Sequence, residues 1–183
     1  MAPDYLQLAD EIFAVRHLFT NAECDDYIAL GESMGFAPAP IQGTFGPSYE
    51  PNVRNNRRVM FDDPSHATAL CDRAWPWIPK QLGFWRAIGV NERLRLYRYD
   101  PGEQFEWHID GAFERQNGER SLITYMVYLN DGFEGGATAF CSQKVFPERG
   151  MGLFFRHELR HKGEAVLRGH KYVLRTDVMY AAI

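Results

Sequence analysis

The second half of the chain is dominated by short segments whose side chains alternate between two sides, as in β-strands. Along residues 92–100, Leu94 and Leu96 point to one side, and Arg95 and Tyr97 point to the other. Further strands are expected at residues 105–110, 121–130, 152–155 and 172–180, and a tight turn followed by a strand is expected within residues 135–140. Because no βαβ rhythm links these segments, the pattern predicts an antiparallel sheet sandwich or barrel.

Two helices are expected before these strands, after a short strand within residues 10–19. Thr20 and Glu23 form a capping box at the start of the first helix, and Gly35 is a natural stop for it. Pro64 suits the first turn of the second helix, which Trp75 ends just before a proline. The fold class is therefore α+β or mainly β, with both helices in the N-terminal half.

Length and charge limit the classes of protein to consider. The chain has 183 residues, 45% of them hydrophobic and 14% aromatic, which is enough for one packed domain. Its net charge of −4 and its pI of about 5.9 provide no overall positive field for nucleic acid or anionic lipid. We therefore expect no nucleic-acid partner.

The cysteines and the N-terminus indicate the compartment. Cys24, Cys71 and Cys141 are widely spaced and odd in number, which fits a reducing cytoplasm better than a disulfide framework. The acidic N-terminus does not look like a secretory signal, and no apolar run approaches the roughly 20 residues of a membrane span. We expect a soluble, cytoplasmic protein with no membrane partner.

The segment FEWHID carries a candidate metal site. His108 and Asp110 lie two residues apart, so a regular strand would point both to one side, where they could grip one divalent ion. His161 is the candidate for a third ligand. Two histidines and one carboxylate, with the opposite positions open, form the ligand set of non-haem Fe(II) oxygenases.

Lys171 lies ten residues after His161, on the last expected strand. A lysine that enters the same cavity would be costly to bury unless an anion pairs with it. That anion is either a protein carboxylate or the far end of a dicarboxylate bound to the metal. The second possibility indicates 2-oxoglutarate, whose keto acid end would chelate Fe(II).

Three ordered segments together resemble the 2-oxoglutarate- and Fe(II)-dependent oxygenases, in particular their prolyl 4-hydroxylase-like branch. The resemblance runs from about Glu92 to Tyr180, half of the chain, and rests on the segments LYRYDPGEQFEWHID, YMVYLNDGFEGGATAF and HKGEAVLRGHKYVLRTDVMY. The specific features are HxD, then EGGxTxF, then a histidine with a lysine ten positions later. The resemblance implies a double-stranded β-helix, also called a jelly-roll or cupin-like core, with the helices packed on one outer face.

The resemblance also implies a role for individual residues. His108, Asp110 and His161 would hold the iron, and Lys171 would bind the C5 carboxylate of 2-oxoglutarate. The spacing to Lys171 favours His161 over His157, which is then a hydrogen-bonded neighbour. The cofactors implied are Fe(II), 2-oxoglutarate and O2, with ascorbate as a reductant.

Three further residues match family positions beside the cosubstrate. Tyr99 lies nine residues before the first ligand, and Thr124 and Tyr128 occupy inward positions of a strand that offers hydroxyl groups. The resemblance divides a single domain into residues 1–90, with helical support and a substrate loop, and residues 91–183, the metal- and cosubstrate-binding core. Alanine at 165, where the family often has proline, changes backbone stiffness only. Lysine instead of arginine at 171 argues against the nucleic-acid demethylase branch.

The implied reaction is hydroxylation of a C–H bond, coupled to decarboxylation of 2-oxoglutarate to succinate and CO2. The substrate is a prolyl or other residue of a peptide or protein, or else a small molecule such as a free amino acid or natural-product intermediate. Arg54, Arg57 and Arg58 form either a loop at the mouth of the site that contacts an acidic substrate, or a solvated hairpin tip. Arg175 either reaches substrate or cosubstrate or forms an ion pair with an acid such as Asp177.

Two rival functions use the same residues. A zinc-dependent cupin-like hydrolase could use the three ligands, but it would need a general base near the metal and would have no use for Lys171. A non-catalytic module could bind a metal or 2-oxoglutarate, but it would not need open coordination positions.

Overall fold

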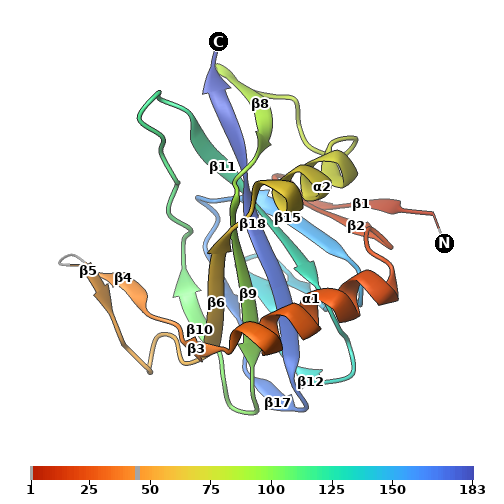
Figure 1. The fold of residues 1–183 in the computed structure, drawn as a ribbon, viewed down its shortest axis with the longest axis vertical. Helices are drawn as coiled ribbons and strands as arrows, with labels where there is room; N and C mark the ends of the chain where they lie inside the picture. Colours follow the sequence, from red (N-terminus) through yellow and green to blue (C-terminus); the bar gives the residue numbers. More distant parts are fainter. Residues whose placement is uncertain (1, 44–45) are drawn as a thin grey trace.

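The computed structural model describes residues 2–43 and 46–183, which form two facing β-sheets with two helices on one outer face (Figure 1). The larger, ten-stranded sheet has the order β1-β2-β15-β11-β18-β9-β6-β3, and β8 joins β18 and carries β7. Its strands are β1 Asp4–Ala9, β2 Ile12–Arg16, β3 Ala37–Pro38, β6 Arg57–Asp62, β7 Gln81–Leu82, β8 Trp85–Val90, β9 Arg93–Tyr99, β11 Arg120–Tyr128, β15 Gly152–Arg156 and β18 Lys171–Ala182.

The smaller sheet has the order β10-β16-β13-β14. Its strands are β10 Phe105–His108, β13 Thr138–Phe140, β14 Lys144–Val145 and β16 His161–Gly163. Two separate ribbons pair β4 Ile41–Gly43 with β5 Gly46–Ser48, and β12 Glu134–Gly135 with β17 Val166–Arg168. Within the described residues, every strand pair in these sheets is antiparallel, in agreement with the predicted sandwich.

Both predicted helices are confirmed, and their ends follow the expected capping chemistry. Helix α1 spans Asn21–Met34, and the Thr20 hydroxyl accepts from the Glu23 amide at 3.3 Å while the Glu23 carboxylate accepts from the Thr20 amide at 2.8 Å. Gly35 ends α1 at φ 80°, a conformation that glycine adopts readily. Helix α2 spans Pro64–Ala74 and is capped by the Asp63 carboxylate.

The hydrophobic core has two layers, one on each side of the larger sheet. Leu96 and Leu174 face the helices and pack in one cluster with Leu70 of α2. Tyr97 and Tyr99 point the other way, into the space between the two sheets. The predicted alternation along β9 is therefore confirmed, and it assigns the leucines to the structural core and the tyrosines to the interior between the sheets.

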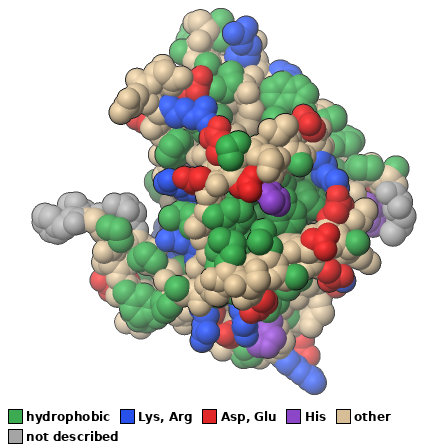
Figure 2. Space-filling view, viewed as in Figure 1, with side chains coloured by type: hydrophobic (Ala, Val, Ile, Leu, Met, Phe, Trp, Pro, Cys, Tyr) green, Lys and Arg blue, Asp and Glu red, His purple; other side chains and the backbone are tan. Residues whose placement is uncertain are grey.

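The helix-bearing face has a separate apolar groove, which is remote from the predicted site. Hydrophobic side chains gather near the centre of this face (Figure 2). Phe19, Tyr27, Leu30 and Leu70 line a groove of about 380 Å³ between α1 and α2. In the described residues, no helix combines the length and the apolar character needed to cross a membrane.

The structure corrects the expected regular strand at residues 105–110. β10 ends at His108, and its pairing with β16 shifts register between Phe105 and His108. This irregularity breaks the two-residue alternation, so the Phe105 ring stacks on the His108 ring at 3.5 Å instead of facing away from it. Asp110 lies beyond the strand, where its amide donates to the carbonyl of His157.

The N-terminal half contributes more strands than expected. β1, β2, β6 and β8 all belong to the larger sheet, although residues 1–90 were predicted to provide mainly helices and a loop. Arg57 and Arg58 begin β6, which pairs with β9, and Arg54 forms an isolated bridge with Phe105. The arginine-rich segment is therefore tied to the sheet rather than forming a hairpin tip.

The central position of β18 predicts a large effect of core truncation. Leu174 is 1% exposed and packs in the helix-side cluster, so Leu174→Ala should lower the free energy of unfolding by about 2–5 kcal/mol. Leu167→Ala, at a side chain that is 71% exposed, should change it by less than about 0.5 kcal/mol. Urea denaturation measures both values, and equal losses in the two variants would contradict this description of the core.

Candidate functional site

Two histidines and one carboxylate meet at the edge of the smaller sheet. His108 and His161 are paired across β10 and β16, and their rings lie 4.2 Å apart. Nε2 of each histidine lies 3.7 Å from a different oxygen of Asp110. One ligand atom from each of the three residues lies within 4.8 Å of the other two, so the group could hold one metal ion.

Hydrogen bonds to the main chain orient both imidazole rings. Nδ1 of His108 lies 2.6 Å from the Glu106 carbonyl, and Nδ1 of His161 lies 2.9 Å from the Leu159 carbonyl. A carbonyl oxygen only accepts, so each Nδ1 donates and each Nε2 keeps a free lone pair toward the site. Burial is the main cause that lowers the pKa of His108 to about 4 and lowers that of His161, so both rings are neutral at pH 7.

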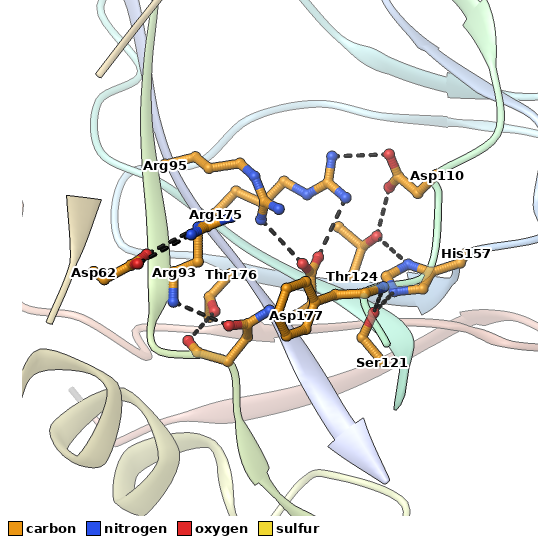
Figure 3. A network of polar contacts seen from close by, with 12 residues as sticks. Asp62, Arg93, Arg95, Asp110, Ser121, Thr124, His157, Arg175, Thr176 and Asp177 are labelled. Carbon is orange, nitrogen blue, oxygen red and sulfur yellow. Dashed lines mark hydrogen bonds and ion pairs between the residues drawn. The ribbon is translucent and has the colours of Figure 1, made fainter. Parts of the chain in front are cut away.

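Asp110 is buried and is held by two donors. Arg175 donates from Nη1 to Oδ1 at 2.8 Å, and Thr124 donates its hydroxyl to Oδ2 at 2.5 Å (Figure 3). Burial raises the pKa of this carboxyl, but Arg175 and the other neighbours outweigh burial, so the pKa lies well below its ordinary value. The carboxylate therefore stays charged and available as a ligand.

A directed series of hydrogen bonds lies behind Asp110 (Figure 3). His157 contacts the Thr124 hydroxyl through Nδ1 at 2.9 Å and the Ser121 hydroxyl through Nε2 at 2.8 Å. Because the Thr124 proton goes to Asp110, His157 donates to Thr124 and accepts from Ser121. His157 thus forms the hydrogen-bonded contact that was expected, and it is not part of the group of possible ligands found in the described residues.

The cavity beside the three candidate ligands, here called the inner pocket, contains a buried lysine. The side chain of Lys171 is 2% exposed and donates to the Gly136 carbonyl at 2.6 Å. Its Nζ lies 5.1 Å from the centre of the Tyr99 ring and 5.4 Å from that of Tyr128. Within the described residues, no carboxylate lies within 4.0 Å of this amine, and burial lowers its pKa to about 7.

The other predicted cosubstrate residues also border this cavity or support it. Tyr99 and Thr124 line the inner pocket, and the Tyr128 hydroxyl shares a hydrogen bond of 2.7 Å with Thr138. Thr124 directs its proton to Asp110, and a contact of Thr124 with the cosubstrate stays a prediction. Thr138 was not singled out from the sequence, although its position as the threonine of EGGxTxF was an available signal.

The four predicted substrate arginines have different environments. Arg54 and Arg58 line a second, outer cavity next to the inner pocket. Arg57 lies 3.8 Å from Asp100 and 4.0 Å from Glu103, and it does not line either cavity. Arg175 borders both cavities and binds Asp110 and Asp177, which is the ion-pair alternative considered for it.

Comparison with known proteins agrees with this geometry. The family model described as 2OG-Fe(II) oxygenase superfamily matches residues 94–176. Prolyl 4-hydroxylase 2 of Arabidopsis thaliana is 25% identical over 76% of this chain and 46% of its own length. Prolyl 4-hydroxylase 5 of the same plant is 29% identical over 69% of this chain and 43% of its own length. The match thus spans less than half of the length of either relative.

Solved structures show the same fold. The viral collagen prolyl hydroxylase vCPH from Paramecium Bursaria Chlorella virus-1, in its 2OG complex, superposes with a TM-score of 0.64 at 20% identity, covering 96% of this chain and 100% of the viral one. A Pseudomonas putida prolyl-4-hydroxylase gives a TM-score of 0.66 at 18% identity, covering 92% of each chain. The predicted double-stranded β-helix with helices on one face is therefore confirmed.

The geometry predicts different metal affinities for three variants. Loss of a residue that hydrogen-bonds to a metal ligand typically weakens metal binding by about 10–100-fold. His161→Ala removes a candidate ligand itself and should weaken Co(II) binding by more than this. Thr124→Val removes such a partner of Asp110 and should fall within that range. His170→Ala alters a half-exposed ring bonded to Asp100, and it should leave affinity unchanged. Absorption titration with Co(II) measures all three, and equal affinity of His161→Ala and wild type would exclude His161 as a ligand.

Proposed function

We propose that this chain is a member of the 2OG-Fe(II) oxygenase superfamily, which its residues 94–176 match, and that it holds Fe(II) on His108, Asp110 and His161 and hydroxylates a C–H bond of its substrate. The observation that carries the proposal is the convergence of two neutral imidazole nitrogens and one charged carboxylate on a single point. This donor set is the one that suits non-haem Fe(II).

The inner pocket fits 2-oxoglutarate by charge. Lys171 is buried beside Tyr99 and Tyr128 without a carboxylate partner in the described residues, and a buried ammonium group is costly unless an anion neutralises it. The Lys171 amine lines the same cavity as the three candidate ligands. A dicarboxylate could therefore reach the metal with one end and Lys171 with the other.

The two cofactors would supply the oxidising chemistry, in which O2 places one oxygen atom in the substrate hydroxyl and the other in succinate while CO2 leaves 2-oxoglutarate. The protein residues provide geometry and shelter. Arg175 and Thr124 fix the two oxygens of Asp110, and the main-chain carbonyls fix the histidine rings. Met126, Phe155 and Val173 line the inner pocket with apolar groups that exclude water.

For the substrate, we propose a prolyl or other residue of a peptide or protein. The names of the curated relatives support this class, as does a Trichoplax adhaerens prolyl hydroxylase solved with a peptide fragment, which superposes with a TM-score of 0.68 at 15% identity. A small molecule is the second candidate, because the outer cavity of about 590 Å³ has the size of a small-molecule site. Ascorbate is proposed as the reductant that keeps iron in the Fe(II) state.

Anaerobic titration with Fe(II) and 2-oxoglutarate tests the cofactor assignment without a substrate. The visible charge-transfer absorption of the chelate should appear in wild type. Lys171→Ala should keep metal affinity but weaken 2-oxoglutarate binding by about 10–100-fold, the range for a lost hydrogen bond to a charged group. Lys144→Ala, at a largely exposed lysine, is the matched control. Metal binding without the band would favour a zinc hydrolase or a binding module instead.

The depressed pKa of Lys171 predicts a pH dependence of 2-oxoglutarate binding. In the free protein this pKa is about 7, so the amine is mostly neutral at pH 8, and a bound carboxylate would raise the pKa. Binding above pH 7 therefore takes up a proton, and affinity should fall by up to about tenfold for each unit of rising pH. Calorimetry in two buffers of different ionisation enthalpy measures the uptake. Lys171→Ala should abolish it, and an unchanged uptake would assign the proton to another group.

A further inference from the structure

The outer cavity is lined by arginines, although the chain as a whole carries a net charge of −4. It adjoins the inner pocket, and the two cavities share Tyr97, Phe105, His108, Asp110 and Arg175. The arginines that line it are Arg54, Arg58, Arg93, Arg95 and Arg175. A cavity of about 590 Å³ beside the three candidate metal ligands is therefore rich in guanidinium groups.

Three of the five guanidinium groups are neutralised by carboxylates. Arg93 binds both oxygens of Asp62, at 2.9 and 3.0 Å. The buried carboxylate of Asp177 lies between the other two groups (Figure 3). It accepts from Arg95 at 3.0 Å and from Arg175 at 3.2 Å, and Arg175 also binds Asp110. These three arginines have structural partners and need no ligand.

Arg54 and Arg58 differ, because no carboxylate lies within 4.0 Å of either in the part of the chain that the structure describes. Arg54 is only 5% exposed, and its Nε donates to Asn56 at 2.7 Å while its Nη2 is buried without a hydrogen-bond partner. Arg58 is partly buried, and burial lowers its pKa. Burial of a cation without an anion costs free energy, so an anion from outside the chain would stabilise these two groups.

The buried phenol of Tyr97 lies close to guanidinium groups of both kinds, those with and those without a carboxylate partner. Burial raises the pKa of the Tyr97 phenol, but nearby guanidinium groups outweigh burial, so that this pKa lies below its ordinary value. Arg175 makes the largest contribution among these guanidinium groups, followed by Arg54, Arg95 and Arg58. The positive potential therefore extends over the passage where the outer cavity meets the inner pocket.

The position of Arg54 is fixed by two aromatic rings. Its guanidinium carbon lies 4.8 Å from the centre of the Tyr97 ring and 4.4 Å from that of Phe105. The Phe105 ring also stacks on the His108 ring, so the guanidinium and a candidate metal ligand both contact this phenyl ring. A guanidinium that lies over aromatic rings can still offer N–H groups to an anion, and its fork matches a planar carboxylate.

We propose that the substrate carries a carboxylate that Arg54 and Arg58 bind in the outer cavity, close to the carbon that is oxidised. This inference rests on the proposed function and names the substrate class of that site. The carboxylate is not that of 2-oxoglutarate, because Lys171 borders only the inner pocket whereas Arg54 and Arg58 border only the outer cavity. It belongs to an acidic peptide or to a small acid, which share this chemistry.

Binding calorimetry with charge-matched probes tests the proposal without turnover. The protein is loaded with Zn²⁺ and saturating 2-oxoglutarate, so that the inner pocket is filled and no redox reaction occurs. The peptide probes are two terminally blocked pentapeptides with glutamate or glutamine after a central proline. The small probes are N-acetylproline and N-acetylprolinamide. Wild type should bind the carboxylate compound of one pair at least about tenfold more tightly than the matching amide. A preference in the peptide pair indicates an acidic peptide as substrate, and a preference in the small pair indicates a small acid.

Single variants show which arginines cause the preference for carboxylate probes over amide probes. Arg54→Gln and Arg58→Gln should each remove most of it, and Arg54→Lys should weaken it by loss of the guanidinium fork. Arg57 is the neighbouring residue on the opposite side of β6, near Asp100 and Glu103. Arg57→Gln removes the same charge, and this variant should still prefer the carboxylate probe over the amide. Thermal unfolding shows whether each variant is folded, and Arg58→Gln, at a less buried position, tests the proposal if Arg54→Gln does not fold.

Two outcomes overturn the proposal: neither carboxylate compound is preferred over its amide, or the preference persists in both glutamine variants. The anaerobic charge-transfer titration on the same preparations separates this proposal from the proposed function. A normal band without carboxylate preference overturns only the substrate class. A carboxylate preference that depends on Arg54 and Arg58, without the band, supports the anion site and overturns the oxygenase assignment.

Discussion

The buried contact between Arg175 and Asp110 is the interaction on which the site depends. Asp110 lies beyond the end of β10, so the hydrogen bonds of the sheet do not position it. Arg175 lies on β18, the central strand, and brings a fixed positive charge to the carboxylate from the larger sheet. A carboxylate buried at this depth would otherwise take up a proton. The ion pair therefore joins the two sheets and keeps a charged oxygen ligand where the histidines meet.

The inner pocket and the outer cavity contain different cationic side chains. Lys171 is enclosed by Tyr99 and Tyr128 in the inner pocket, whereas Arg54 is held between two rings at the boundary of the outer cavity. A compact ammonium group and a planar fork differ in geometry, so the two sites suit different anions. His108 and Asp110 border both cavities. A domain with this arrangement could hold two different anions beside the same candidate ligands.

Local pattern was enough to predict much of the fold and the metal group. The capping box at Thr20 and the leucine–tyrosine alternation of β9 depend on neighbours in sequence, and both are present as predicted. The irregular β10 could not be predicted, because its register shift arises from pairing with β16, more than fifty residues away. The burial of Arg54 was missed for the same reason: a run of arginines looks solvated until distant rings enclose one of them.

The hydrogen bonds from Ser121 through His157 and Thr124 to Asp110 all run in one direction. Consecutive hydrogen bonds of this kind polarise one another, so each bond strengthens the next, and the Asp110 carboxylate is the final acceptor. Ser121, which also accepts from the Phe113 amide, therefore influences the electron density on an oxygen of Asp110 that it does not touch. The basicity of this candidate metal ligand is in this way partly a property of a neutral serine on the larger sheet.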